Sequence, residues 1–285
     1  MSLPVRRPLT NRQVKAVRGD RALDLPDELV TEEPLEVRVA WRGPSSPVAI
    51  TMRTPGHDFE LAVGFLLSEG IVGAASWVRS VVYCRPDGAE QDLNVVTVHL
   101  DRPIDLALRR AVPVSASCGV CGTATLDQLA DRCGPLPEGP ALPLRVLLGL
   151  PERLRREQPL FERSGGLHGA GIFDHRGEPV VVREDIGRHN AVDKIVGWAA
   201  LDGGLPLREC VLVVSGRVSF EIVQKAAVAG IPVIVAVSAA SSLAVETADR
   251  LGICLVGFAR GDRANIYSHA ERLDLTEPSA PLSVD

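Results

Sequence analysis

The stretch VLVVSGRVSFEIVQKAAVAGIPVIVAVSAASS, residues 211–242, sets the architecture of this chain. It holds two continuous apolar runs, 211–214 and 233–237, on either side of a helical segment at 220–229. Short strands without polar alternation are typical of a parallel sheet that helices cover on both faces. A third apolar run at 254–258 repeats the rhythm of strand and helix. The pattern predicts an α/β fold built on a mainly parallel sheet.

The rest of the chain divides near residue 115. We expect an α+β module at 25–115, an α/β domain at 116–272, and loosely ordered tails at 1–24 and 273–285, which are rich in Pro, Arg or small residues. The other expected strands are 35–41, 48–52, 78–83, 93–100, 167–173 and 179–183, and the other expected helices are 57–67, 123–130, 144–156, 189–200 and 243–251.

Composition limits the classes of protein that this chain fits. Its 285 residues and 46% hydrophobic content suffice for a large core, and its formal charge of −5 gives no general argument for nucleic acid or a membrane surface. No apolar run reaches the roughly 18 residues that span a bilayer, and the basic N-terminus lacks the apolar stretch of a signal peptide. The six cysteines lack the spacing typical of a secreted disulfide scaffold, which indicates that they are reduced thiols. We expect a cytoplasmic protein that binds neither membrane nor nucleic acid.

Cys118 and Cys121 form a CxxC in the run SASCGVCG, residues 115–122. Thiols at this spacing serve redox exchange, zinc binding or sulfur carried as a persulfide, and a glycine-rich turn can also hold two buried thiols. No Asp or Glu occurs between residues 106 and 126, and two arginines lie just upstream at 109 and 110. Nearby positive charge favours the thiolate, as does the start of a helix at about residue 123. The pattern favours a nucleophile.

Polar loops follow the three predicted parallel strands, where α/β proteins place their ligands. These loops are 215–217, 238–241 and 259–263, which combine small residues with Arg217, Arg260 and Arg263. Backbone N–H groups, hydroxyls and guanidinium groups suit a ligand with several phosphates. The serines and glycines suit ordinary turns and helix caps equally well. Neither a GxGxxG fingerprint nor a Walker loop is present, which argues against a dinucleotide-dependent oxidoreductase and a P-loop ATPase.

Two further segments have the composition of a ligand site. In REDIGRHNAVDK, residues 183–194, Asp185 ends a predicted strand and His189 opens a helix. In SGGLHGAG, residues 164–171, small neighbours around His168 leave room for a bulky ligand, although a lone histidine is more often structural. The candidate ligand-binding residues are therefore His168, Asp185, His189, Ser215, Gly216, Arg217, Phe258, Ala259, Arg260, Gly261, Asp262 and Arg263.

These segments together resemble the FdhD family of formate dehydrogenase accessory sulfurtransferases. The resemblance rests on the order and spacing of SCGVCG at 117–122, TPGHD at 54–58 with GFLLSEG at 64–70, EDIGRHNAVDK at 184–194, SGR at 215–217 and GFARG at 257–261. It covers most of the chain and shows no departure at the cysteines.

The resemblance implies a cytidine-deaminase-like α/β fold for the C-terminal part, and a homodimer. It also implies that a cysteine desulfurase loads sulfur onto the CxxC. The protein would pass this sulfur to the bis(guanine dinucleotide) molybdenum or tungsten cofactor that formate dehydrogenase needs. Cys118 would carry the persulfide, with Cys121 as a helper or resolving thiol. Residues 258–263 match the cofactor-binding segment, so guanine nucleotide (GDP) would be a partial mimic. Asp262 or Asp185 could pair with a guanine edge.

Alternative functions make different demands on the sequence. A zinc-dependent nucleobase deaminase needs H-x-E before P-C-x-x-C, but the H-x-E here follows the cysteines, at 269–271, and Ser117 replaces the proline. A structural zinc site would need further ligands such as Cys133 or His168. A thioredoxin-like oxidoreductase would place the CxxC after a strand of a βαβ unit, a pattern not seen here. A cofactor chaperone would bind the cofactor without using the cysteines. We expect no resident metal and a sulfurtransferase that acts as a carrier.

Overall fold

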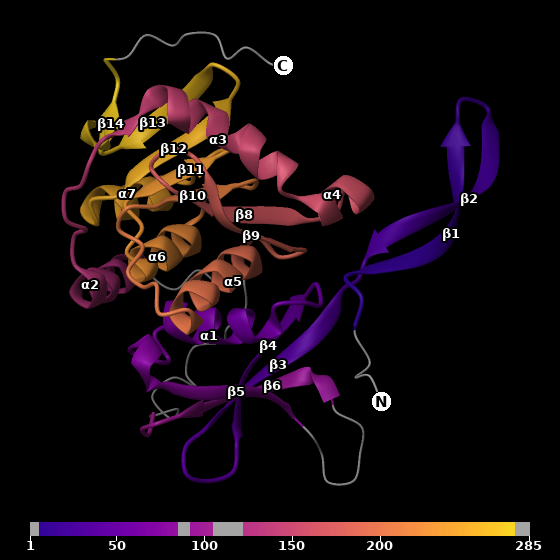
Figure 1. The fold of residues 1–285 in the computed structure, drawn as a ribbon, viewed down its shortest axis with the longest axis horizontal. Helices are drawn as coiled ribbons and strands as arrows, with labels where there is room; N and C mark the ends of the chain where they lie inside the picture. The colour runs from indigo at the N-terminus through magenta and orange to yellow at the C-terminus, as the bar shows by residue number, and fades with distance from the viewer. Residues whose placement is uncertain (1–5, 85–91, 105–121, 277–285) are drawn as a thin grey trace.

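Two sheets organise the chain in a computed structural model that describes residues 6–84, 92–104 and 122–276 (Figure 1). A four-stranded sheet forms from the N-terminal part and a six-stranded sheet from the C-terminal part, with helices between them. The fold is therefore α/β, as the sequence predicts. The expected boundary near residue 115 lies outside the described residues, so the division into two domains stays a prediction. No helix among the described residues is long and apolar enough to cross a membrane.

The four-stranded sheet has the order β4-β3-β6-β5. β3 (Glu33–Ala40) and β4 (Ser46–Arg53) form the expected antiparallel hairpin, and β5 (Val78–Cys84) and β6 (Asp92–Leu100) pair antiparallel beside it. Alternate residues of β3 and β6, such as Leu35, Val37 and Val96, are fully buried. They face α1 (Asp58–Ser68), whose apolar positions recur at helical spacing. These elements confirm the expected α+β composition of this region.

The six-stranded sheet has the order β13-β12-β11-β10-β8-β9. Its strands are β8 (His168–Phe173), β9 (Pro179–Asp185), β10 (Val211–Val214), β11 (Val233–Ala236), β12 (Cys254–Arg260) and β13 (Arg263–Ser268). Only the central strands β10, β11 and β12 run parallel, while β8, β9 and β13 are antiparallel to their neighbours. The expectation of a mainly parallel sheet was wrong. Short hairpin turns join β8 to β9 and β12 to β13, and a hairpin can only produce antiparallel strands.

Helices cover both faces of this sheet. Leu212 and Ile234 share a core with α5 (Arg188–Leu201) and α6 (Phe220–Ala229). Val211, Val213 and Val235 point to the other face and pack with α3 (Leu144–Arg156). This alternation explains why the central strands are continuously apolar. The other α-helices of the described residues are α2 (Gly122–Cys133), α4 (Pro159–Ser164) and α7 (Ser242–Arg250), and short 3-10 helices occur at Ala75–Trp77 and Ala270–Arg272.

A close crossing of α1 and α5 joins the two sheets (Figure 1). Glycine occupies the contact on both helices. A Cβ atom added to Gly64 would lie 1.8 Å from the carbonyl oxygen of Asp193, and one added to Gly197 would lie 1.8 Å from that of Glu60. Backbone therefore packs directly against backbone. One continuous core extends from β3 through these helices to β11.

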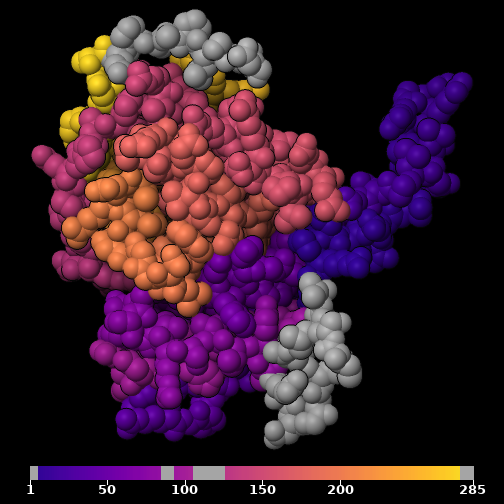
Figure 2. Space-filling model, viewed as in Figure 1, coloured from indigo at the N-terminus to yellow at the C-terminus, as the bar shows by residue number. Residues whose placement is uncertain are grey.

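Much of the N-terminal segment is ordered, although the sequence predicts a loosely ordered tail at residues 1–24. β1 (Leu9–Arg18) and β2 (Arg21–Val30) pair as a hairpin that projects from the body of the molecule (Figures 1 and 2). The expected tail at residues 1–24 is thus wrong for residues 9–24. At the other end, β14 (Leu273–Asp274) pairs with β7 (Leu142–Pro143), so residues 273 and 274 also belong to the fold. Neither pairing has the apolar pattern that identifies a buried strand in a sequence.

Candidate functional site

The ends of five strands meet at one edge of the six-stranded sheet. β10, β11 and β12 are parallel, so their carboxyl ends lie together. β8 runs antiparallel to β10, which places its first residue, His168, at the same edge, and His168 pairs with Asp185 at the end of β9. We call the segments 168–169, 185–189, 215–219, 237–241 and 258–263 the strand-end rim. The segments that carry the described candidate residues thus lie at one edge of the sheet, although not all of the side chains face solvent there.

Backbone pairing fixes the segment that follows β10. The N–H of Ser215 donates to the carbonyl oxygen of Gly169 at 3.0 Å, and the N–H of Gly169 donates to Oγ of Ser215 at 2.9 Å. Gly216 lies against His168, since an added Cβ would be 3.3 Å from Nδ1 of that ring and 3.6 Å from Cδ of Arg188. The absence of a side chain at 216 lets both groups approach the strand end. Arg217 is exposed.

The two histidines of the rim are held neutral. Burial, together with the guanidinium of Arg188, lowers the pKa of His168, and the carboxylate of Asp185 opposes this only in part. Burial, followed by the charges of Arg188 and Lys225, lowers the pKa of His189 to about 4. Both imidazoles can therefore donate and accept hydrogen bonds at neutral pH. The positive charge of this part of the rim comes from arginine.

Residues 258–263 comprise the end of β12, the turn at Gly261 and Asp262, and the first residue of β13, and they extend beyond the end of β11. Phe258 has a φ of 52°, which is rare for a residue with a bulky side chain, and the residue is 49% exposed. Its N–H donates to the carbonyl oxygen of Ser238 at 3.1 Å. Arg260, Gly261, Asp262 and Arg263 are exposed, whereas Ala259 is buried in the core of the α3 face. Strained backbone with an exposed aromatic ring is characteristic of ligand sites.

Asp185 has a different place from the one expected. Its side chain is fully buried and lies 2.7 Å from Nζ of Lys194. Its oxygens also accept hydrogen bonds from the N–H groups of Thr54 and Gly187 and from Nδ2 of Asn190. A guanine edge cannot reach this carboxylate, so the expected contact is wrong for Asp185. Asp185 instead holds the strand-end rim in position. Pairing with a guanine edge stays a prediction for Asp262 alone.

The same contacts join two distant motifs. Thr54 belongs to TPGHD, while Asp185 and Lys194 belong to EDIGRHNAVDK. Besides its bond to Asp185, Thr54 accepts a hydrogen bond from Nζ of Lys194 at its carbonyl oxygen, at 3.1 Å. Its Oγ1 accepts another from the N–H of Ile186 at 3.2 Å. TPGHD therefore supports the rim from the N-terminal part of the chain.

A second buried charge pair completes this support. Arg53 and Asp58 are almost fully buried and form a bidentate pair at 3.0 and 2.9 Å. The hydroxyl of Tyr83 donates to Asp58 at 3.2 Å. Burial, followed by the charge of Asp58, raises the pKa of Tyr83 to about 12. This network holds the start of α1 beside the rim.

Sequence reasoning did not identify Arg188, Lys194 or Ser219 as site residues. Lys194 lies within a helix whose apolar neighbours give no sign of a buried ion pair. Ser219 precedes α6 and has the pattern of an ordinary N-cap. Arg188 was part of the charged run around the start of α5. No pattern in the chain distinguishes these residues from solvated ones.

Cys118 and Cys121 lie outside the described residues, and so do Arg109 and Arg110. α2 begins at Gly122, the residue after Cys121, as expected. In the described part of the chain, no group of three or more His, Cys, Asp or Glu side chains could hold a metal ion. Zinc binding by the cysteines stays an open alternative.

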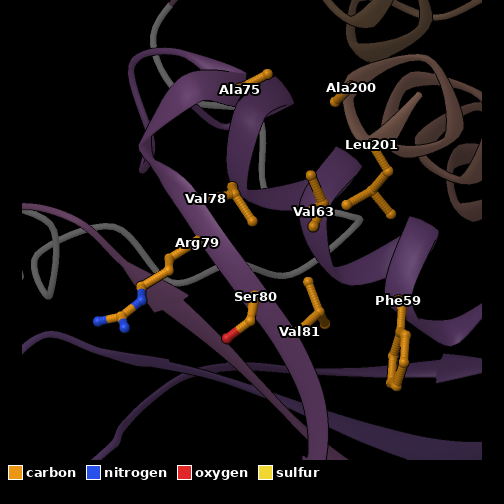
Figure 3. Close-up of a pocket in the computed structure, with 9 residues that line it drawn as sticks. All are labelled: Phe59, Val63, Ala75, Val78, Arg79, Ser80, Val81, Ala200 and Leu201. Carbon is orange, nitrogen blue, oxygen red and sulfur yellow. The ribbon is translucent and has the colours of Figure 1, made fainter. Parts of the chain in front are cut away.

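A cavity of about 360 Å³ lies elsewhere, between β5 and the carboxyl end of α5 (Figure 3). Its walls include Phe59, Val63, Val81 and Leu201. The rim adjoins the other end of α5, about 20 Å away along a helix of 14 residues. The cavity is therefore separate from the candidate site.

Comparisons with known proteins identify one family by sequence and a matching fold by structure. The model of the FdhD/NarQ family matches residues 30–274. Proteins named sulfur carrier protein FdhD are similar to this chain. The one from Streptomyces avermitilis is 48% identical, and the match covers 94% of this chain and 97% of that protein. The one from Mycobacterium tuberculosis is 46% identical, and the match covers 92% of this chain and 98% of that protein. The crystal structure of a formate dehydrogenase accessory protein from Desulfotalea psychrophila superposes with a TM-score of 0.71 at 23% identity, covering 93% of this chain and 99% of that one.

Proposed function

Because the chain belongs to the FdhD/NarQ family, we propose that it is a sulfur carrier that serves the maturation of formate dehydrogenase. The proposed substrate is the bis(guanine dinucleotide) molybdenum or tungsten cofactor. A cysteine desulfurase supplies the sulfur, and formate dehydrogenase is the client. The protein works as a sulfurtransferase that carries one sulfur atom at a time, in the cytoplasm. The homodimer and the cytidine-deaminase-like fold of the C-terminal part stay predictions.

The observation that carries this proposal is the gathering of polar strand ends at one edge of the sheet. Arg217, Arg260 and Arg263 approach this edge from two loops and are exposed there. Guanidinium groups bind phosphates through paired N–H donors, which suits a ligand that carries several phosphates. The exposed ring of Phe258 offers a face on which a base can stack. A ligand with phosphates and bases fits both features.

Loading of sulfur needs only thiolate chemistry. The Cys118 thiolate attacks the terminal sulfur of a persulfide on the donor enzyme. The new bond joins this sulfur to Sγ of Cys118, and the donor's S–S bond breaks, so the donor cysteine leaves as a thiolate. No external oxidant or reductant is required. Two arginines at 109 and 110, and the absence of acidic residues between 106 and 126, favour the thiolate.

Delivery of sulfur requires two electrons if sulfur arrives as sulfide. Cys121 can supply them. Its thiolate attacks Sγ of Cys118, the terminal sulfur leaves as hydrosulfide toward the bound cofactor, and a Cys118–Cys121 disulfide forms. A cellular dithiol then reduces this disulfide. This sequence gives each cysteine of the CxxC a distinct role.

The test is intact-mass measurement after incubation with cysteine and a cysteine desulfurase. Wild-type protein should gain one sulfur atom that reductant removes, whereas Cys118→Ala should gain none. Cys121→Ala should load sulfur but fail to release it. Cys133→Ala is the matched control, because burial raises the pKa of the Cys133 thiol and so suppresses its thiolate.

Two other results would change the assignment. If no variant gains sulfur while all bind GDP equally, the protein is a cofactor chaperone. If zinc copurifies in stoichiometric amount and is lost in Cys118→Ala, the CxxC is a metal site.

A further inference from the structure

Ser219 occupies the N-cap position of α6 but does not cap it. Serine at this position normally accepts a hydrogen bond from a backbone N–H in the first turn. Ser241 does so at the equivalent position of α7, where its Oγ accepts from the N–H of Ala244 at 3.2 Å. Oγ of Ser219 lies instead 3.1 Å from Nε2 of His189. A stabilising cap is therefore given up for a contact at the strand-end rim.

Glu221 determines the direction of this hydrogen bond. Its Oε2 lies 3.9 Å from Nε2 of His189, and although burial raises the pKa of Glu221, hydrogen bonding and the nearby charges of His189 and Lys225 lower it overall. Glu221 is thus a carboxylate at neutral pH and can only accept. A carboxylate on the Nε2 side of the ring favours a proton on Nε2, so Nε2 donates to Oγ of Ser219. The proton of the neutral His189 ring consequently lies on Nε2.

We propose that Ser219 and Glu221 are positioning residues that lock His189 in the tautomer with its proton on Nε2, leaving Nδ1 as a fixed hydrogen-bond acceptor at the rim. A ligand group that donates an N–H or O–H is then favoured over one that only accepts. Guanine carries N–H donors and is the base of the proposed substrate. The binding of guanine by Nδ1 of His189 rests on the proposed function, whereas the tautomer itself does not.

The surroundings support an acceptor at this position. Cδ of Arg188 lies beside Gly216, and its buried Nε has no partner among the described residues. Arginine provides only donors, and Ser215 has its Oγ bonded to Gly169. With Asp185 fully buried, the partly exposed imidazoles of His168 and His189 are acceptors near Arg188, and His189 is the one whose Nε2 is engaged by Ser219. Arg188 and His189 together therefore offer a ligand one hydrogen-bond donor and one acceptor.

The tautomer is measured directly by ¹⁵N NMR of the protein labelled at histidine. In wild type, the His189 signals should report a protonated Nε2 and an unprotonated Nδ1 between pH 6 and 8. Ser219→Thr keeps the hydroxyl and should keep this pattern, whereas Ser219→Ala should give a mixture of tautomers. Ser241→Ala is the matched control, because it removes a capping serine that does not contact His189. A proton on Nδ1 in wild type, or an unchanged pattern in Ser219→Ala, would overturn the lock.

Addition of GDP tests the acceptor role. The Nδ1 signal of wild type should shift toward the value of a hydrogen-bonded acceptor, while the Nε2 signal stays in place. Ser219→Ala should bind GDP about tenfold more weakly, and Ser219→Thr should bind as wild type. Binding of GDP without a change at Nδ1 overturns the acceptor role. If neither wild type nor any variant binds GDP, the proposed substrate is overturned, and so is the role of Nδ1 of His189 as an acceptor from that substrate. A single tautomer of His189 measured in the free protein would still stand.

Discussion

The backbone N–H of Thr54 donates to Oδ2 of Asp185 at 3.2 Å, across 131 positions of the sequence. Lys194 lies on the other side of this carboxylate, at 2.7 Å. The buried ion pair therefore links the N-terminal motif to the end of β9. Since His168 pairs with Asp185, the same contact sets the position of the strand-end rim.

Asp185→Asn should destabilise the protein strongly. Lys194 would remain buried without its counter-charge, and loss of one partner of such a pair costs about 3–5 kcal/mol. Chemical denaturation measures this cost. Asp262→Asn is the control, because Asp262 is exposed and should change the free energy of unfolding by less than about 0.5 kcal/mol. A cost for Asp185→Asn as small as that of the control would show that the pair does not hold the rim.

Gly197→Ala tests the crossing of α1 and α5. The added methyl group would lie 1.8 Å from the carbonyl oxygen of Glu60, so the helices must separate. We expect a loss of about 1–3 kcal/mol of stability, the range for overpacked cores, although alanine favours helix more than glycine does. Gly204→Ala places its methyl group at an ordinary van der Waals distance, 3.8 Å from the carbonyl oxygen of Ala199. If thermal or denaturant unfolding gives equal stabilities for the two variants, the close crossing is incorrect.

Much of the fold follows from local patterns, and part of it does not. The runs at 211–214 and 220–229 form the expected strand and helix, because a buried strand and its covering helix both need continuous or periodic apolar residues. β1 and β2 were missed because neither contributes much to the core. The burial of Asp185 was also missed. A carboxylate at a strand end has the same sequence pattern whether it faces solvent or, as here, a buried lysine of α5.

The rim itself was partly predictable for a topological reason. Parallel strands place their carboxyl ends together, so loops 215–217 and 258–263 had to meet at one edge. The position of His168 depends on the antiparallel pairing of β8 with β10. The contact between Ser219 and His189 joins two helix starts, and no periodicity encodes such a contact.

Phe258→Gly should separate stability from function. Glycine adopts a positive φ readily, whereas a left-handed conformation costs other residues about 1–2 kcal/mol. We expect stability to stay the same or to rise by up to about 1 kcal/mol. If the ring stacks on a base, GDP binding measured by calorimetry should fall at least about tenfold, and Phe258→Tyr should preserve it. A clear loss of stability in Phe258→Gly would mean that the ring packs against the protein instead.

The stability of the protein should depend on pH through His189. Burial is the largest cause of the low pKa of His189; the charges of Arg188 and Lys225 lower it further, the Glu221 carboxylate raises it, and protonation of His168 would lower it. Its native pKa of about 4 is below the ordinary imidazole value of about 6.5, so the unfolded chain takes up the proton first. The free energy of unfolding should thus fall as pH falls from about 6.5 to about 4.

His189→Gln isolates this contribution. The variant lacks the titrating group, so its stability should fall less over that interval, by up to about 3 kcal/mol. Denaturation series between pH 4 and 8 provide the comparison, with parallel profiles expected above pH 7. Identical slopes for the two proteins below pH 6.5 would contradict a buried neutral His189.

The most direct test of the proposed function is transfer of labelled sulfur to formate dehydrogenase. The protein is first loaded with ³⁵S by a cysteine desulfurase and then mixed with cofactor-containing client enzyme. Label should move from wild type, and none should move from Cys118→Ala. The double variant Arg260→Ala with Arg263→Ala should load label normally but transfer it at least about tenfold more slowly, while Arg12→Ala, exposed on β1, should act as wild type. Transfer from the double variant at the wild-type rate, or loading of Cys118→Ala, would contradict a sulfur carrier that acts on a ligand bound at the strand-end rim.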